Sequence, residues 1–183
     1  MSQFDTATLA GGCFWCTEAV FDRLKGVTKV VPGYAASKVE NPSYEQVCSG
    51  RTGAAEAIQI TYDPSIISFE TLLDIFWHLH DPTTLNRQGN DIGTQYRSAI
   101  FYQTDEQERL ALASKEALEQ SGTYKKPIVT EIVPFTNFYA AEAYHEDYYD
   151  RNPYQPYCQF VIDPKVRKLL KEYRKEVKDE LAR

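Results

Sequence analysis

The residues with the clearest capacity for chemistry lie near the N-terminus, in the run Gly11-Gly12-Cys13-Phe14-Trp15-Cys16. Residues 6–10 read as a short strand, and apolar residues recur at helical spacing over 14–24 until Gly26. Cys13 is therefore expected at or just before a helix N-terminus, where unpaired N–H groups and the helix dipole stabilise a thiolate. We predict a reactive thiol at Cys13; a small buried hydrophobic residue is the alternative.

A second thiol, Cys16, follows within the same helical turn. Residues i and i+3 of a helix have Cα atoms about 5–6 Å apart, inside the range that a disulfide spans. Cys16 can therefore reach Cys13 with little backbone movement. Of the two remaining cysteines, Cys48 lies in a short predicted helix and is most simply a buried structural thiol.

A buried carboxyl group is predicted at Glu56. Residues 57–62 alternate, with Ile58 and Ile60 on one face of a half-buried strand, and Glu56 should point to that same face. An ionised, unpaired carboxylate there costs several kcal/mol, so Glu56 should be protonated, paired or catalytic. A solvent-exposed glutamate at the end of the strand is the alternative.

The polar segment 81–97, which contains Asp91 and Tyr96, is long for a loop. Loops of this length without secondary structure are uncommon and usually functional, so we interpret it as part of a site. A flexible surface excursion is the alternative. Tyr34, in the turn-rich residues 32–34, is equally compatible with a core and a site position.

Length, composition and charge restrict the classes of protein to which this chain can belong. The 183 residues suit a single domain over 1–183, and we expect a monomer. No apolar run approaches the roughly 18 residues of a membrane span, and the start of the chain lacks a signal peptide, so we expect a cytoplasmic protein. Four cysteines in a reducing compartment indicate redox or metal chemistry. The net charge of −6, without a basic patch, argues against nucleic acid as a partner.

Strands and helices alternate along the rest of the chain. The patterns predict further strands at 27–31, 57–62, 97–102 and 128–134, and helices at 41–50, 69–77, 104–122 and 165–183. The tyrosine-rich segment 137–158 should be irregular apart from a helix around 140–150. The last helix, 165–183, is amphipathic and should pack on the body of the domain. This order predicts an α/β fold, a two-layer sandwich with helices packed on a mixed sheet.

A series of short motifs resembles the A-type peptide-methionine sulfoxide reductases, with order and spacing kept from about residue 8 to 158. The motifs are Gly12-Cys13-Phe14-Trp15, Gly33-Tyr34, Gly53-Ala54-Ala55-Glu56-Ala57, Phe76-Trp77, His80-Asp81-Pro82, Arg87-Gln88-Gly89-Asn90-Asp91 and Gly93-Thr94-Gln95-Tyr96-Arg97-Ser98. The resemblance implies a ferredoxin-like α/β sandwich forming a single catalytic domain. It also implies reduction of methionine-S-sulfoxide, free or in proteins, and recycling by thioredoxin.

The reductive step needs a thiolate nucleophile and a proton for the sulfoxide oxygen. We expect Cys13 to be the nucleophile and Glu56, kept protonated by burial, to be the general acid. Tyr34 and Tyr96 can donate hydrogen bonds to the sulfoxide oxygen.

Other residues would bind the substrate. Phe14 and Trp15 offer an apolar slot for the ε-methyl group, which would favour one epimer. The resemblance assigns Asp91 to the edge of this pocket, in contact with the substrate backbone. No metal or organic cofactor is required.

Cys13 would be left as a sulfenic acid, which a resolving thiol converts into a disulfide that an external reductant opens. The chain departs from the commonest family pattern here: Cys16 stands where glycine is frequent, and Cys158 lies in a tail that lacks the usual glycines. We favour Cys16, because a strand predicted after Tyr157 would limit the approach of Cys158. A relay from a Cys13–Cys16 to a Cys16–Cys158 disulfide stays open.

Two other functions compete with this interpretation. A thioredoxin-like dithiol oxidoreductase would use Cys13 and Cys16 directly but leaves Glu56 and the segment 81–97 without a role. A zinc-stabilised interaction domain would need two tight cysteine pairs, and the sequence has one. His78 and His80 diverge on a helix and cannot share a metal there.

Overall fold

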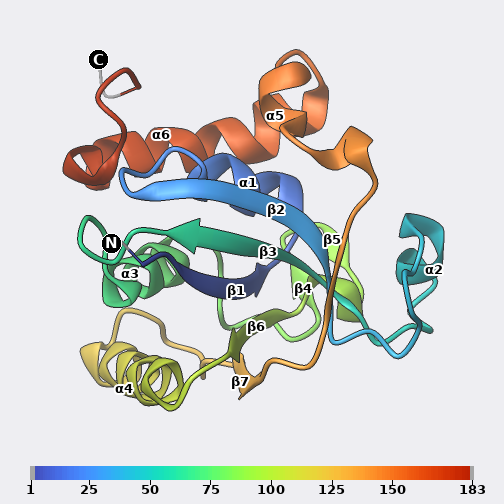
Figure 1. Cartoon of the computed structure of the whole chain (residues 1–183), viewed down its shortest axis with the longest axis horizontal. Helices are drawn as coiled ribbons and strands as arrows, with labels where there is room; N and C mark the ends of the chain where they lie inside the picture. Colours follow the sequence, from blue (N-terminus) through green and yellow to red (C-terminus); the bar gives the residue numbers. More distant parts are fainter. Residues whose placement is uncertain (1–2, 182–183) are drawn as a thin grey trace.

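The computed structural model describes residues 3–181, which form a six-stranded mixed sheet with helices packed on it (Figure 1). The strand order is β7-β6-β1-β3-β2-β8, and all neighbours are antiparallel except the parallel pair β6–β7. The strands of this sheet are β1 (Asp5–Gly11), β2 (Val27–Ala35), β3 (Ala55–Tyr62), β6 (Ser98–Tyr102), β7 (Glu131–Pro134) and β8 (Phe138–Ala140). Two further strands, β4 (Arg87–Gln88) and β5 (Asp91–Ile92), pair with each other as a separate antiparallel ribbon. The helices are α1 (Phe14–Phe21), α2 (Tyr44–Cys48), α3 (Phe69–Leu79), α4 (Asp105–Ser121), α5 (Tyr148–Arg151) and α6 (Asp163–Glu172). The predicted mixed α/β fold is confirmed.

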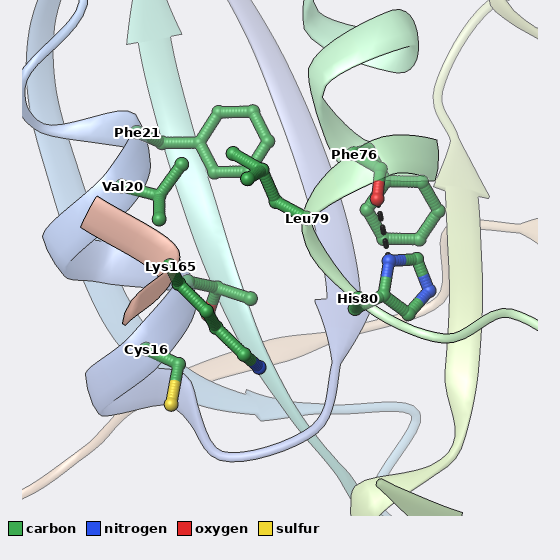
Figure 2. Close-up of a pocket in the computed structure, with 8 residues that line it drawn as sticks. Cys16, Val20, Phe21, Phe76, Leu79, His80 and Lys165 are labelled. Carbon is green, nitrogen blue, oxygen red and sulfur yellow. Dashed lines mark hydrogen bonds between the residues drawn. The ribbon is translucent and has the colours of Figure 1, made fainter. Parts of the chain in front are cut away.

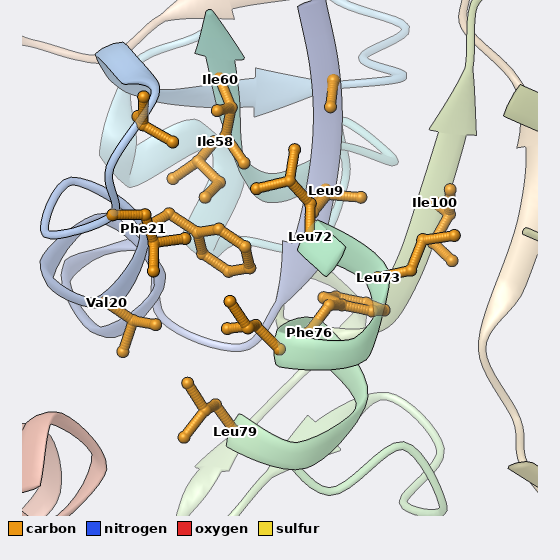
Figure 3. Packing of buried hydrophobic residues seen from close by; sticks show 14 of the residues in the cluster. Leu9, Val20, Phe21, Ile58, Ile60, Leu72, Leu73, Phe76, Leu79 and Ile100 are labelled. Atoms are coloured by element: carbon orange, nitrogen blue, oxygen red, sulfur yellow. The ribbon is translucent and has the colours of Figure 1, made fainter. Parts of the chain in front are cut away.

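The alternation of side chains along the central strands gives the sheet two different apolar faces. On one face, Leu9, Ile58 and Ile60 pack against Phe21 of α1 and Leu72 of α3 (Figure 3). The opposite face carries small side chains and one phenylalanine, namely Ala10, Ala35, Ala55, Ala57, Ala99 and Phe101. Since a slip of one residue would exchange the two faces, this core fixes the register of β1 against β3.

The first and last predicted helices are both shorter than the sequence suggested. α1 ends at Phe21, and Leu24 forms an isolated antiparallel bridge with Val177. The predicted helix 165–183 is wrong in its bounds, because α6 covers Asp163–Glu172 and a 3₁₀ turn then leads to the extended residue Val177. Pairing with Leu24 buries Val177 completely, which a continued helix would not do.

β2 continues beyond the predicted strand 27–31 and passes through residues 32–34, where the sequence suggested a turn. It pairs with β3 on one side and with β8 on the other. At Gly33 a Cβ atom would overlap the ring of Phe138 and lie 2.5 Å from the carbonyl oxygen of Tyr139. Glycine is therefore required for the close approach of β8 rather than for a turn.

The C-terminal third also differs from the prediction. In place of a helix around 140–150 there is a 3₁₀ turn, Ala143–His145, followed by the short helix α5. The strand predicted after Tyr157 is wrong: Cys158–Ile162 form a π-helical turn that leads into α6. The predicted burial of Cys48 is also wrong, because Cys48 is exposed at the end of the one-turn helix α2.

Within residues 3–181, none of the helices combines the length and apolar character that crossing a bilayer demands.

Candidate active site

Cys13 lies between the end of β1 and the first turn of α1, where it is the N-cap residue. The chain reaches this position through Gly12, which has a φ of +92°. A Cβ at Gly12 would lie 2.7 Å from Cγ of Gln88, so the ribbon formed by β4 and β5 packs directly on this turn. The Cys13 side chain is almost fully buried. The predicted placement of Cys13 at the start of a helix is therefore confirmed.

Glu56 projects from β3 toward the same turn and is 1% exposed, which confirms its predicted burial. Its Oε1 accepts the backbone N–H of Phe14 at 3.3 Å. Its Oε2 is buried and has no hydrogen-bond partner among the residues described. Burial, reinforced by the charges of Asp91 and Cys16, raises the pKa of Glu56 to about 8 despite the Phe14 N–H. A protonated carboxyl group with one unpartnered oxygen therefore lies beside Cys13 at neutral pH.

The tyrosines around this carboxyl group do not have equivalent surroundings. Tyr34 is fully buried, and its hydroxyl donates to Glu142 Oε1 at 2.9 Å. The backbone N–H of Tyr44, at the start of α2, donates to the other carboxylate oxygen of Glu142 at 3.2 Å. Burial, followed by the charge of Glu56, raises the pKa of Tyr96.

The Tyr44 hydroxyl is buried near the same charged groups, Glu56 and Cys13, as the Tyr96 hydroxyl. The pKa of Tyr44 is raised by burial and by a hydrogen bond with Cys48, and also by the charges of Glu56 and Cys13. Sequence reasoning missed Tyr44 and Glu142, because their meeting depends on the pairing of β8 with β2. The only local signal was the capping box at Ser43, which fixes the start of α2.

Aromatic side chains form one wall of the site. The Trp15 indole stacks on Tyr148 with ring centroids 3.7 Å apart. The Trp15 Nε1–H donates to Nδ1 of His145 at 3.0 Å, and the His145 ring lies 4.9 Å from the Phe14 ring. His145 was not predicted as a site residue, because it lies within the segment 137–158, where no pattern singled it out. Trp15 is therefore held from both its ring face and its nitrogen.

Asp91, in β5, lies in a groove beside the thiols. It accepts a hydrogen bond from the hydroxyl of Tyr157 at 2.6 Å, and the same hydroxyl lies 3.6 Å from the Cys16 sulfur. Cys13, Cys16, Asp91 and Tyr157 line a groove of about 450 Å³. The segment 81–97 therefore contributes Asp91 and Tyr96 to the site, although it contains two short strands and a 3₁₀ turn rather than an unstructured loop.

Three of the four thiols share one apolar cluster. Cys13, Cys16 and Cys158 pack together with Ile162 and Val166, whereas Cys48 lies outside the cluster. Burial raises the pKa of Cys158, and the charge of Cys16 raises it further because the two thiols lie close together.

The two N-terminal thiols differ in ionisation. Burial, the hydrogen bond with Cys16 and the charge of Glu56 raise the pKa of Cys13, whereas the backbone N–H of Trp15 at the start of α1 lowers it. The hydrogen bond from Cys13 lowers the pKa of Cys16 to about 7, aided by Lys165 and Tyr157 and opposed by burial. The pKa of Cys16 therefore lies below that of Cys13, so Cys16 is the thiol of the pair that ionises first.

His78 in α3 and His80, the residue that follows it, both have structural partners. Nδ1 of His80 bonds the carbonyl oxygen of Phe76 at 2.5 Å, and its Nε2 bonds Ser98 Oγ at 2.8 Å (Figure 2). Nδ1 of His78 instead bonds the carbonyl oxygen of Asp74. In residues 3–181 no group of three or more potential ligands has the spacing of a metal site.

Comparison with known proteins agrees with this arrangement. The family model described as peptide methionine sulfoxide reductase matches residues 5–178. The peptide methionine sulfoxide reductase MsrA of Sulfolobus acidocaldarius is 56% identical, over 92% of this chain and 95% of its own. The crystal structure of reduced Mxr1 from Saccharomyces cerevisiae gives a TM-score of 0.80 at 38% identity, covering 85% of this chain and 90% of that one. Mxr1 in complex with Trx2 gives a TM-score of 0.57 at 27% identity, over 80% and 85% of the two chains. The chain therefore belongs to the peptide methionine sulfoxide reductase family.

Proposed function

We propose that this protein reduces methionine-S-sulfoxide, free or in proteins, to methionine. The observation that carries the proposal is the Glu56 carboxyl group, which is protonated at neutral pH, has a free Oε2 and lies beside Cys13. A sulfoxide is reduced by a thiol only when its oxygen receives a proton. A buried acid beside a nucleophile supplies this proton without exposing the reaction to solvent.

In the first step, the Cys13 sulfur attacks the sulfoxide sulfur while Glu56 protonates the oxygen. As the bond between the Cys13 sulfur and the substrate sulfur forms, the protonated S–O bond breaks and the oxygen leaves as water. Water then adds to the Cys13 sulfur as the S–S bond breaks, methionine leaves as the thioether, and the proton released restores Glu56. The products are methionine and a Cys13 sulfenic acid, so the substrate loses one oxygen atom, Cys13 gains one and the number of protons is unchanged.

Tyr96 and Tyr44 donate hydrogen bonds to the sulfoxide oxygen as charge builds on it. Tyr44 replaces Tyr34 in this role, because the Tyr34 hydroxyl already donates to Glu142. Tyr34 acts instead through Glu142, whose other carboxylate oxygen binds the backbone of Tyr44.

Phe14 and Trp15 form the slot for the ε-methyl group, and Asp91 lies at the pocket edge, where it contacts the substrate backbone. The contacts of Trp15 with Tyr148 and His145 support this role, because they hold the indole in one orientation. A fixed slot on one side of the sulfur is how one epimer is preferred.

Cys16 then resolves the sulfenic acid and forms a disulfide with Cys13. Its position one helical turn away and its lowered pKa support this role. Cys158 packs against the same thiols, and it begins a π-helical turn rather than preceding a strand. A relay to a Cys16–Cys158 disulfide is therefore compatible with the arrangement. Thioredoxin reduces the disulfide, an inference supported by the relative Mxr1, which has been solved in complex with Trx2.

We further infer that residues 1–183 are a single catalytic domain with a ferredoxin-like, two-layer arrangement. We infer that it acts as a cytoplasmic monomer. A core shared by β1, β2, β3, β6, α1, α3 and α6 supports the single domain, since each buried cluster among residues 3–181 combines segments that lie far apart in the sequence.

The deciding experiment compares the two epimers of methionine sulfoxide as substrates of the purified protein with dithiothreitol. We expect turnover of the S epimer only, and Cys13→Ser should abolish it because a hydroxyl cannot attack sulfur at neutral pH. Cys48→Ser is the matched control and should retain near-normal turnover, because Cys48 lies outside the thiol cluster. Disulfide reductase activity without sulfoxide turnover would support the thioredoxin-like alternative instead.

A further inference from the structure

Lys165, the third residue of α6, extends into the gap between α1 and the end of α3, with Cys16 on one side and His80 on the other (Figure 2). Together with Cys16 it lines a small space of about 10 Å³ there. It also lines the larger groove that contains Cys13 and Cys16. No carboxylate of the described residues forms an ion pair with its ammonium group. A half-buried lysine without an anionic partner is costly unless another negative charge lies close to it.

Cys16 lines both of these spaces together with Lys165. Two carboxylates also share a pocket with Lys165, Asp91 in the groove and Asp81 on the other side of His80, but neither forms an ion pair with the ammonium group. Burial lowers the pKa of His80 to about 4, so His80 is neutral. Burial raises the pKa of Glu56 to about 8 and also raises that of Cys158, so both are protonated at pH 7. The Cys13 thiol holds its proton as well.

Two further polar groups lie near Cys16 in the groove that Lys165 also lines. The Tyr157 hydroxyl lies 3.6 Å from the Cys16 sulfur and donates to Asp91. The charge of Asp91 disfavours a thiolate at Cys16, whereas that of Lys165 favours it. Among the described groups that act on Cys16, Lys165 is therefore the cation that offsets the charge of Asp91.

We propose that Lys165 is a positioning residue for regeneration: its ammonium group holds Cys16 as the thiolate that attacks the Cys13 sulfenic acid. The inference rests on the proposed function and concerns only its second step. Met and Lys have similar stems, so the packing of residue 165 on α1 and α3 is separable from its charge.

In this step the Cys16 thiolate attacks the sulfenic sulfur of Cys13. The S–S bond forms, the S–O bond breaks, and the oxygen leaves as hydroxide, which takes a proton to become water. The two sulfurs are oxidised by two electrons relative to two thiols, which balances the reduction of one sulfoxide. The rate depends on the fraction of Cys16 that is ionised.

The test follows alkylation of Cys16 by iodoacetamide as a function of pH, with peptide mapping of the reduced protein. For Lys165→Met we expect the midpoint to move up by about one pH unit, the size of shift that loss of one nearby opposite charge produces. Lys165→Arg keeps the charge and should restore the midpoint. Lys168→Met is the matched control, because Lys168 lies one turn along α6 and donates to the carbonyl oxygen of His78.

A second measurement separates the two steps of the reaction. Methionine released from one equivalent of sulfoxide should form at the wild-type rate in Lys165→Met. Disulfide formation at pH 7 should be about fivefold slower, because a one-unit rise takes the thiolate fraction from about one half to about one tenth. The two disulfide rates should converge near pH 9.5.

The outcomes distinguish the inference from the function on which it rests. An unchanged alkylation midpoint in Lys165→Met, with normal methionine release, would overturn the role of Lys165 alone. A slow disulfide step at every pH would also overturn it, because a structural defect does not disappear when Cys16 is fully ionised. Failure of the wild-type protein to release methionine would instead overturn the proposed function.

Discussion

At the scale of single residues, the site depends on two groups whose ionisation the fold shifts in opposite directions. Burial raises the pKa of Glu56 from 4.5 to about 8, and the hydrogen bond from Cys13 lowers that of Cys16 from 9.0 to about 7. In water at pH 7 the carboxyl would be ionised and the thiol would not. The protein therefore places a protonated carboxyl group and a thiol of lowered pKa in one site, which is the combination that the proposed reduction and its resolution require.

Glu56→Gln tests whether the Glu56 carboxyl group is the general acid. The amide can still accept the Phe14 N–H but cannot protonate the sulfoxide oxygen, so methionine release in a single turnover should slow by about 10²–10⁴-fold with little change in substrate affinity. In the wild type, the rate of this step should fall as the pH rises through about 8, because Glu56 then loses its proton. The loss with increasing pH should be absent in the variant.

Glu18→Gln is a matched control for this substitution. Glu18 is also buried, 4% exposed, and its pKa is also raised by burial to about 8, but it lies farther along α1 and outside the groove of the thiols. It should leave single-turnover methionine release unchanged. If Glu56→Gln releases methionine at the wild-type rate, Glu56 is not the general acid.

At the scale of secondary-structure elements, two helical turns bring the thiols together. The first turn of α1 carries Cys13 and Cys16, and the π-helical turn before α6 carries Cys158. Both turns pack into one apolar cluster, so the order of disulfide exchange depends on which sulfur reaches Cys13 first. The backbone N–H of Cys16 already bonds the carbonyl oxygen of Cys13 at 3.1 Å, which favours the partner within α1.

Peptide mapping after one equivalent of sulfoxide, without external thiol, should therefore identify a Cys13–Cys16 disulfide. Cys16→Ser should still release one methionine per chain but lose most thioredoxin-linked turnover. Cys158→Ser is the matched control and should still form the Cys13–Cys16 bond. A mapped Cys13–Cys158 disulfide with full thioredoxin-linked turnover in Cys16→Ser would assign resolution to Cys158.

At the scale of the whole molecule, local patterns predicted the parts of the site that lie within one element. The glycine pair before a helical pattern located Cys13, and the alternation along β3 located Glu56 in the core. Tyr44, Glu142 and His145 were missed, because their meeting depends on the long-range pairing of β8 with β2. The spacing of apolar residues within one segment does not show which distant strands pair with each other.

The same limit explains the errors at residue 33 and at the C-terminus. Gly33 reads as a turn residue from its neighbours, but the structure uses its missing Cβ to admit β8. The apolar periodicity of the last segment continues past Glu172, but Val177 is buried by its bridge to Leu24 instead. Both positions are determined by segments far away in the sequence.

Glu18 makes the stability of the whole fold depend on pH. Burial raises its pKa from 4.5 to about 8, and the charges of Asp147 and Asp22 add to the effect. The folded protein therefore holds a proton that the unfolded chain releases above about pH 4.5. The stabilisation that comes with this proton is complete below about pH 4.5 and is lost as the pH rises through about 8.

Glu18→Gln keeps a neutral side chain at every pH, so it removes this dependence. We expect the free energy of unfolding of the variant, relative to the wild type, to increase steadily between pH 5 and about 8 and then to level off. Urea denaturation of both proteins at pH 5, 6.5, 8 and 9 measures the difference, and the comparison cancels contributions from Glu56 and the thiols, which both proteins share. A difference that stays constant across this range would mean that the pKa of Glu18 is not raised in the folded protein.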